Sequence, residues 1–233
     1  IDGYIIPKND EFFGEYIPEH KDRLKYISNF SGSYGFALIL TNKNYLFVDG
    51  RYTLQANNQC GKFFQIKTIP GQLPEKILKK KKLKIGFDPN LFTKKSLNNF
   101  FGNTNCKYIS LNKNLIDEIW RRKNIVTKNK FYILPSNSIN QNYKQKIDKI
   151  LSIMKQKSAE FQFITASENN AWLLNIRGRD TEYTPIPHSY ILIDNKKNIK
   201  LFCDLKKISP SFKKKFSNIE FSDINSTNLF LSK

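Results

Sequence analysis

The chain has 233 residues, which leaves room for one large domain or two domains of about 110 residues each. Hydrophobic residues make up 39% of the sequence and aromatic residues 14%, which is enough for packed cores and excludes overall disorder. No stretch approaches the roughly 20 consecutive apolar residues of a membrane-spanning helix, so we expect no membrane association.

The formal net charge of +19 would suit a nucleic-acid-binding protein, but the type of basic residue argues against specific binding. Six of the 39 basic residues are arginines, whose planar fork contacts phosphates and bases, and the others are lysines. The lysine runs 79–82 and 213–215 are typical of solvated surface. We predict no specific nucleic-acid binding and keep a basic nucleic-acid-binding protein as an alternative.

The cysteines and the amino-terminal residues bear on the cellular compartment. Cys60, Cys106 and Cys203 are far apart and form no C-x-x-C pair, which predicts reduced, mostly buried thiols. The chain opens on the strand-like residues 1–6 without a charged and then apolar leader, which favours a cytoplasmic protein.

The first half of the chain predicts a hairpin and a helix. Strand-like segments occur at 4–6, 36–40 and 45–48, and the polar residues 41–44 suit a hairpin turn. A helix is expected over residues 19–28, with His20 and Asp22 on its solvated face. We interpret the glycine-rich residues 31–35 as a helix-to-strand turn rather than a phosphate cradle.

Further elements follow in the same order. Residues 49–52 turn the chain into a helix that runs through Gln59, and a strand is expected at 83–87. The next helix starts near Thr93 and places three large apolar residues on one face, namely Leu97, Phe100 and Phe101.

A change of character after Trp120 predicts two domains, 1–125 and 126–233. The second begins with an amphipathic helix over about 142–157, followed by a strand at 161–165 and a hairpin formed by 191–193 and 201–203. The alternation of helices and strands predicts an α/β fold.

The two halves repeat one pattern. Asn29-Phe30-x-Gly32, a hairpin and Asp49 in the first half correspond to Asn175-Ile176-x-Gly178, a hairpin and Asp204 in the second. We interpret this recurrence as an ancient duplication. The helix at 142–157 has no counterpart before Ile1, so we expect that the chain as given lacks the first helix of its first unit.

The residues that could carry chemistry are few. The two histidines, His20 and His188, lie far apart in sequence, and no nucleophile, zinc or P-loop motif is present. We therefore expect neither a metal site nor catalytic residues in this chain.

Arg51 is the most interesting single residue, because it follows a buried-looking strand and Asp49-Gly50. Its guanidinium could form an ion pair with Asp49 or a nearby helix. It could instead bind a carboxylate or carbonyl of a substrate or partner, and the pattern leaves both readings open. Arg177, Arg179 and Asp180 form a second charged turn, for which we favour a structural role at the contact between the domains.

Several motifs of the sequence resemble those of a known family. The motifs Asp49-Gly50-Arg51-Tyr52, Gly86-Phe87-Asp88-Pro89 and Ala171-Trp172-Leu173-Leu174-Asn175-Ile176-Arg177-Gly178 resemble those of Xaa-Pro aminopeptidases (aminopeptidase P). Shorter matches span almost the whole chain in the same order, among them Glu15-Tyr16, Leu54-Gln55-Ala56, the segment 114–120, Pro185 and Ser189-Tyr190.

The resemblance implies two creatinase/prolidase N-terminal-like domains with a ribonuclease H-like α/β fold. It also implies a separate C-terminal pita-bread domain that holds two metal ions, usually manganese, and the catalytic histidines. The implied activity of the full-length enzyme is release of the N-terminal residue from peptides with proline in second position, with the N-terminal domains restricting access. A homodimer and the chain's own catalytic domain are the implied partners.

By the same resemblance, Arg51 corresponds to an arginine that reaches the substrate peptide, and no other contact is carried over. Departures from the family pattern occur at Arg23-Leu24, at Asn29 and at Pro187-His188, and the last affects the second-domain surface that faces the catalytic domain. The alternative function is a stand-alone binding module or pseudoenzyme.

Overall fold

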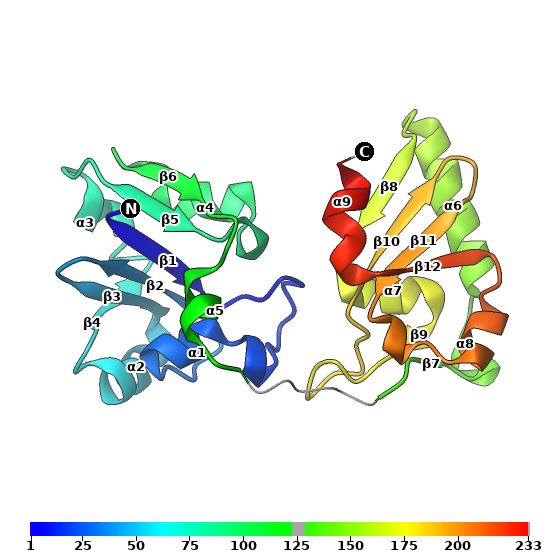
Figure 1. The fold of residues 1–233 in the computed structure, drawn as a ribbon, viewed down its shortest axis with the longest axis horizontal. Coiled ribbons are helices and arrows are strands. Elements are labelled where there is room, and N and C mark those ends of the chain that lie inside the picture. The colour runs from blue at the N-terminus through cyan, green and yellow to red at the C-terminus, as the bar shows by residue number, and fades with distance from the viewer. Residues whose placement is uncertain (123–128, 233) are drawn as a thin grey trace. The chain divides into compact units, whose positions relative to one another are not determined.

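The computed structural model describes residues 1–122 and 129–232. The chain divides into two compact units, Ile1–Ile125 and Val126–Lys233 (Figure 1). Each unit has its own buried hydrophobic residues. The predicted boundary near residue 125 lies outside the described residues. Both units combine a sheet with flanking helices, as the α/β prediction requires, and that prediction is confirmed.

The first unit is built on a six-stranded sheet in the order β4-β3-β2-β1-β5-β6. Antiparallel pairing joins β1 to β2 and β2 to β3, whereas the remaining neighbours are parallel. The strands are β1 (Gly3–Pro7), β2 (Gly35–Leu40), β3 (Asn44–Asp49), β4 (Gln65–Ile69), β5 (Lys84–Phe87) and β6 (Lys107–Ser110).

Helices cover both faces of this sheet because alternate residues of a strand point to opposite sides. Tyr4 and Ile6 of β1 pack with α1 (Arg23–Ser28), α2 (Thr53–Cys60) and α5 (Leu115–Ile119). Ile5 packs on the other side with α3 (Pro74–Leu78) and α4 (Lys94–Phe101). The predicted apolar face of α4 is confirmed, since Leu97, Phe100 and Phe101 all join this second cluster.

The second unit is built on a four-stranded sheet in the order β12-β11-β10-β8. Its core joins this sheet to three of the helices, α6, α7 and α8. The strands are β8 (Phe161–Ile164), β10 (Ser189–Asp194), β11 (Ile199–Cys203) and β12 (Ile219–Asp223), and β7 (Tyr132–Ile133) pairs separately with β9 (Ile176–Arg177). The helices are α6 (Tyr143–Gln156), α7 (Ser167–Leu174), α8 (Pro210–Lys215) and α9 (Thr227–Leu231).

The topology supports the predicted duplication. The succession β1-β2-β3-β4 pairs antiparallel, antiparallel and parallel, and β8-β10-β11-β12 repeats that succession. In both units the helix after the first strand ends in a left-handed asparagine, Asn29 with φ 63° and Asn175 with φ 55°. The units differ at one edge: β1 has β5 on its far side, whereas β8 has no further strand among the described residues, and Phe161 is 62% exposed.

One predicted element is wrong in detail. Residues 19–28 form a 3₁₀ turn, η1 (Glu19–Lys21), and then α1, instead of a single helix. Asp22 separates them: its carboxylate accepts a hydrogen bond from the backbone N–H of Lys25 at 3.1 Å and pairs with Lys8 at 2.5 Å. Asp22 is 7% exposed and His20 is half-buried, so the predicted solvated face is also wrong.

Candidate functional site

Arg51 lies between the end of β3 and the start of α2. β3 ends at Asp49, a 3₁₀ turn η2 (Gly50–Tyr52) follows, and α2 begins at Thr53. The Asp49 carboxylate caps this turn by accepting the backbone N–H of Arg51 at 2.9 Å. The side chain of Arg51 is 75% exposed, so the turn holds the cation at the surface of the first unit.

The Arg51 guanidinium forms the ion pair with Asp49 that the sequence left as one alternative. Nη2 donates to Asp49 Oδ2 at 2.6 Å, and Nε lies 3.2 Å from both carboxylate oxygens. This contact lowers the pKa of Asp49 and raises that of Arg51. A guanidinium has five N–H donors, so three remain without an acceptor among the described residues. The ion pair therefore orients Arg51 and leaves it able to bind a further carbonyl or carboxylate.

Tyr52 forms a platform beside Arg51. The Arg51 Cζ lies 5.4 Å from the centre of the Tyr52 ring, and the Tyr52 hydroxyl is 2.7 Å from Ser33 Oγ. Phe30 packs edge-on against the same ring at 5.9 Å. A Cβ on Gly32 would lie 2.3 Å from Phe30 Cζ, so the loop needs glycine at this position.

The glycine-containing loop is fixed to α2 by two glutamines. Gln55 Nε2 and Gln59 Nε2 both donate to Ser31 Oγ at 2.8 Å, and Gln59 Oε1 accepts the Ser31 backbone N–H at 3.0 Å. The backbone N–H of Ser31 therefore donates to Gln59 and is not available to bind a phosphate. This arrangement agrees with our interpretation of residues 31–35 as a turn.

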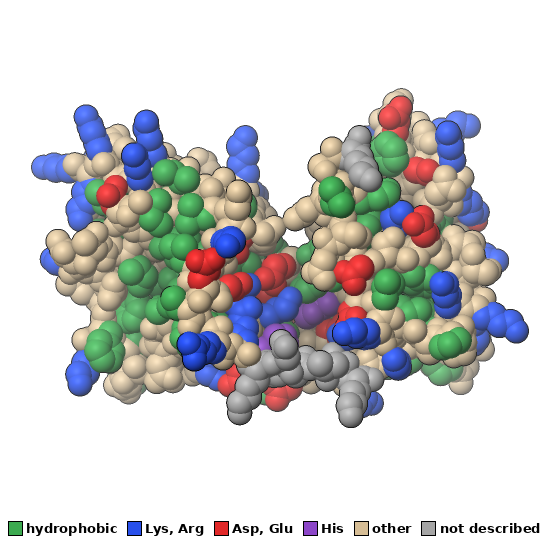
Figure 2. All heavy atoms as spheres, in the orientation of Figure 1, with side chains coloured by type: hydrophobic (Ala, Val, Ile, Leu, Met, Phe, Trp, Pro, Cys, Tyr) green, Lys and Arg blue, Asp and Glu red, His purple; other side chains and the backbone are tan. Residues whose placement is uncertain are grey.

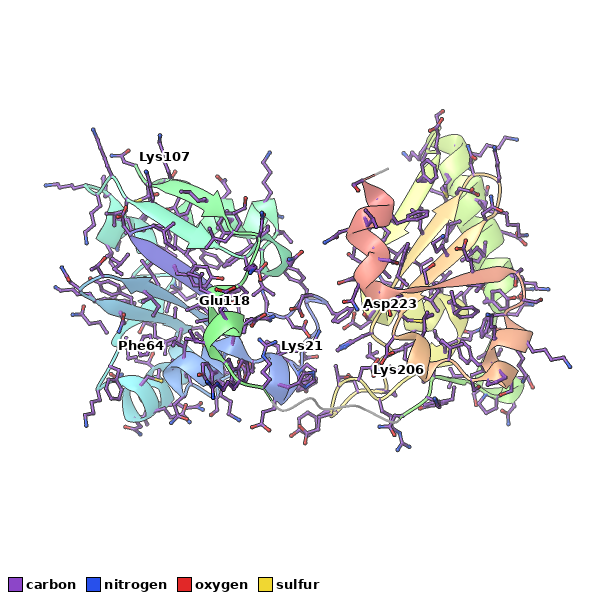
Figure 3. The ribbon with its side chains drawn as sticks, in the orientation of Figure 1. Lys21, Phe64, Lys107, Glu118, Lys206 and Asp223 are labelled. Carbon is purple, nitrogen blue, oxygen red and sulfur yellow. The ribbon has the colours of Figure 1, made fainter. Side chains whose placement is uncertain are left out.

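A partly buried charge network in the first unit was not predicted from the sequence. Arg23 is 3% exposed and donates to Asp117 at 2.7 and 2.8 Å and to Glu11 at 2.6 Å. Lys21, labelled in Figure 3, donates to the same Glu11 carboxylate at 2.9 Å. Burial would raise the pKa of Glu11, but Lys21 and Arg23 outweigh it and lower that pKa to about 2. Arg122 also binds Asp117.

The charged turn of the second unit is bonded within that unit. Arg177 Nη1 donates to the carbonyls of Ile176 at 2.9 Å and Ala171 at 3.2 Å. Asp180 pairs with Lys207 and accepts the backbone N–H of His188 at 2.7 Å. A structural role within the unit is therefore clear for Arg177 and Asp180, and the role between domains stays a prediction.

The described residues do not fit a dinuclear metal centre. Within them no group of three or more His, Cys, Asp or Glu side chains is placed to hold a metal ion. The thiols of Cys60 and Cys203 are buried and reduced, and burial raises the pKa of Cys203 to about 12. Among the same residues, none of the helices is both long enough and apolar enough to cross a bilayer.

Comparison with family models covers both units. The creatinase/prolidase N-terminal domain is matched twice by separate models, over residues 1–118 and over residues 121–233. The chain belongs to this family.

Individual relatives are aminopeptidases. The chain is 30% identical to Xaa-Pro aminopeptidase ApepP of Drosophila melanogaster over 95% of its own length and 38% of the relative. It is 29% identical to aminopeptidase P1 of Lotus japonicus over 91% of its own length and 33% of the relative. The chain therefore spans about a third of the length of the relatives it matches.

A crystal structure from Caenorhabditis elegans is similar to the whole chain. It is an X-prolyl aminopeptidase, described as a cytosolic enzyme with a dinuclear active site. It matches all of this chain and 40% of its own, with 26% identity and a TM-score of 0.91. The chain thus has the fold of the creatinase/prolidase N-terminal domains of an Xaa-Pro aminopeptidase.

Proposed function

We propose that this chain is the N-terminal, non-catalytic region of a metal-dependent Xaa-Pro aminopeptidase that acts on peptides with proline in second position. The observation that carries the proposal is the match of both units to the N-terminal family together with relatives named as Xaa-Pro aminopeptidases. The dinuclear site of the C. elegans relative suggests two metal ions, which we expect to be manganese held outside the described residues.

In this proposal the two units restrict access to the active site and Arg51 binds the peptide. The three N–H donors of Arg51 that have no acceptor among the described residues suit a peptide carbonyl or carboxylate, and the ion pair with Asp49 orients the guanidinium. We also propose that the full-length enzyme is a homodimer and lies in the cytoplasm. The C. elegans relative, described as cytosolic, supports the location.

The test of Arg51 is its replacement by alanine in the full-length enzyme, assayed on an Xaa-Pro-Pro tripeptide with manganese present. Loss of a charge-assisted hydrogen bond to the peptide should lower kcat/KM by about 10- to 100-fold. Arg121→Ala is the matched control, because Arg121 is an exposed arginine of the same unit. Equal kcat/KM for Arg51→Ala and the unmodified enzyme would refute the assigned role.

A second assay tests the non-catalytic status of the region. This 233-residue chain should be inactive on the tripeptide, whereas the full-length enzyme should cleave it. Cleavage by the short chain would reveal a metal site that the described residues do not form. If neither protein cleaves, the stand-alone binding module becomes the better function.

A further inference from the structure

Two cations meet at one end of a helix in the second unit. Lys146 of α6 is 6% exposed, and its Nζ donates to the Trp172 carbonyl at 2.5 Å and to Asn175 Oδ1 at 2.6 Å. Arg177 donates to the Ala171 carbonyl of the same helix, α7, at 3.2 Å. Both side chains therefore gather around the carboxyl end of α7.

The acceptors available to these cations are all neutral. The hydrogen-bond acceptors that the described residues give to Lys146 and Arg177 are carbonyl or amide oxygens, and Lys146 also lies over the neutral ring of Trp172. Burial first, and then the charge of Arg177, lower the pKa of Lys146. The end of a helix supplies roughly half a negative charge, which leaves more than one positive charge uncompensated in a partly buried region.

Several donors are also unused. An ammonium has three N–H groups and Lys146 uses two of them, whereas Arg177 uses the two N–H groups of Nη1. Within the described residues the third N–H of Lys146 has only the face of the Trp172 ring beside it, and three N–H groups of Arg177 lack an acceptor. N–H donors without an acceptor therefore lie next to uncompensated positive charge.

A cavity of about 240 Å³ lies beside these donors. Both polar and apolar residues line it, and its size suits one small group and not a folded partner. The polar residues of the lining are Ser138, Asn140, Gln141, Lys146, Asn175 and Arg177, and the apolar ones are Leu134, Ile139 and Trp172.

We propose that this cavity binds a small oxyanion, a carboxylate or a phosphate group, between Lys146 and Arg177. A carboxylate or phosphate would accept the unused N–H groups and neutralise the excess charge, as charge-assisted hydrogen bonds do. Capping of α7 explains the contacts of both cations with carbonyls, but it does not explain the unused donors of Arg177 or the adjoining cavity.

The test uses the fluorescence of Trp172, because the Lys146 Nζ lies 4.1 Å from the centre of its ring. The chain has two tryptophans, so Trp120→Phe isolates this signal. Sodium phosphate and sodium acetate are titrated into this variant at constant ionic strength, with sodium chloride as the reference. A saturable change with phosphate, acetate or both supports the proposal, and the more effective anion identifies the ligand class.

Variants separate a site from general attraction to a basic protein. Lys146→Met and Arg177→Gln should each weaken binding at least about tenfold, whereas Lys144→Gln removes an exposed lysine of the same helix and should leave it unchanged. If Lys146→Met does not fold, Arg177→Gln decides, with the increase in Tm caused by the oxyanion as a second readout. Equal effects of chloride and the oxyanions, or unchanged binding in Arg177→Gln, would overturn the proposal.

Discussion

Arg23 shows how one residue can be central to a unit and inconspicuous in the sequence. Its guanidinium contacts Glu11, twelve residues earlier, and Asp117, 94 residues later. Sequence spacing gives no signal for such contacts, because they form only when β1, α1 and α5 have packed together. The environment of Arg51 was easier to anticipate, since its main partner, Asp49, is two residues away.

Removing the charge of Arg23 should destabilise the first unit. Arg23→Met leaves Glu11 and Asp117 without their shared cation in a partly buried region, which should cost about 3 kcal/mol of the free energy of unfolding. Urea denaturation measures this difference. Arg121→Met changes an exposed arginine of the same unit and should stay within about 0.5 kcal/mol of the unmodified chain. Equal losses for the two variants would mean that the network contributes no net stability.

Glu11 should make stability depend on pH. Its pKa falls from 4.5 in the unfolded chain to about 2 in the folded one, so its ionised form stabilises the fold above pH 4.5. That contribution is lost as the pH falls through 2. At pH 7 Glu11→Gln should be less stable than the unmodified chain by about 2 kcal/mol, and the gap should shrink steadily below pH 4.5. Urea titrations at several pH values measure the gap, and a gap that does not change with pH would contradict the assignment.

Local elements were predicted better than the connections between them. The hairpin of β2 and β3, the hairpin of β10 and β11, and the amphipathic helix α6 all agree with the sequence pattern. Each is set by residues close in sequence. By contrast, β6 is a short edge strand without buried residues, and η1 and α1 are divided by one aspartate whose partner, Lys8, lies fourteen residues earlier. The hydrophobic pattern of the sequence predicted neither β6 nor the break between η1 and α1.

The two left-handed asparagines should respond differently to replacement. Asn29 is exposed and its side chain has no partner among the described residues, so Asn29→Gly should be neutral or up to about 1 kcal/mol more stable. Asn175 binds Lys146 Nζ and donates to the Gln141 carbonyl at 2.9 Å. Asn175→Gly should therefore cost about 2 kcal/mol. Thermal unfolding compares the two, and equal responses would show that backbone conformation alone selects these residues.

At the scale of the whole chain, the repeat of one pattern in both units was visible in the sequence but its limits were not. The shared order of strands followed from the recurring Asn-apolar-x-Gly motif and the hairpins. Nothing in the motif indicated that β8 would have no neighbouring strand, within the part of the chain that the structure describes, where β1 has β5. β1 and β8 occupy equivalent positions in the repeat. The strand β5 beside β1 comes after the four repeated strands of the first unit, so the repeat itself does not predict it.

The net charge of +19 also belongs to the whole molecule. Figure 2 shows lysines and arginines scattered over the visible face, and several of them project from the first unit near α3. The run Lys79–Lys82 follows that helix and is exposed. Such a surface should attract polyanions weakly and without sequence preference, and affinity for a DNA duplex should fall at least about 100-fold between about 50 and 200 mM salt.

Fluorescence anisotropy with two unrelated duplexes measures that affinity. Replacing the four lysines of 79–82 by glutamine should reduce the salt dependence by an amount similar to replacing the exposed run Lys213–Lys215 of the second unit, since both are solvated surface. A tenfold preference for one duplex, or binding that survives the higher salt, would contradict this expectation. Either result would favour the nucleic-acid-binding alternative, because specific contacts to bases do not weaken with salt in the way that lysine–phosphate attraction does.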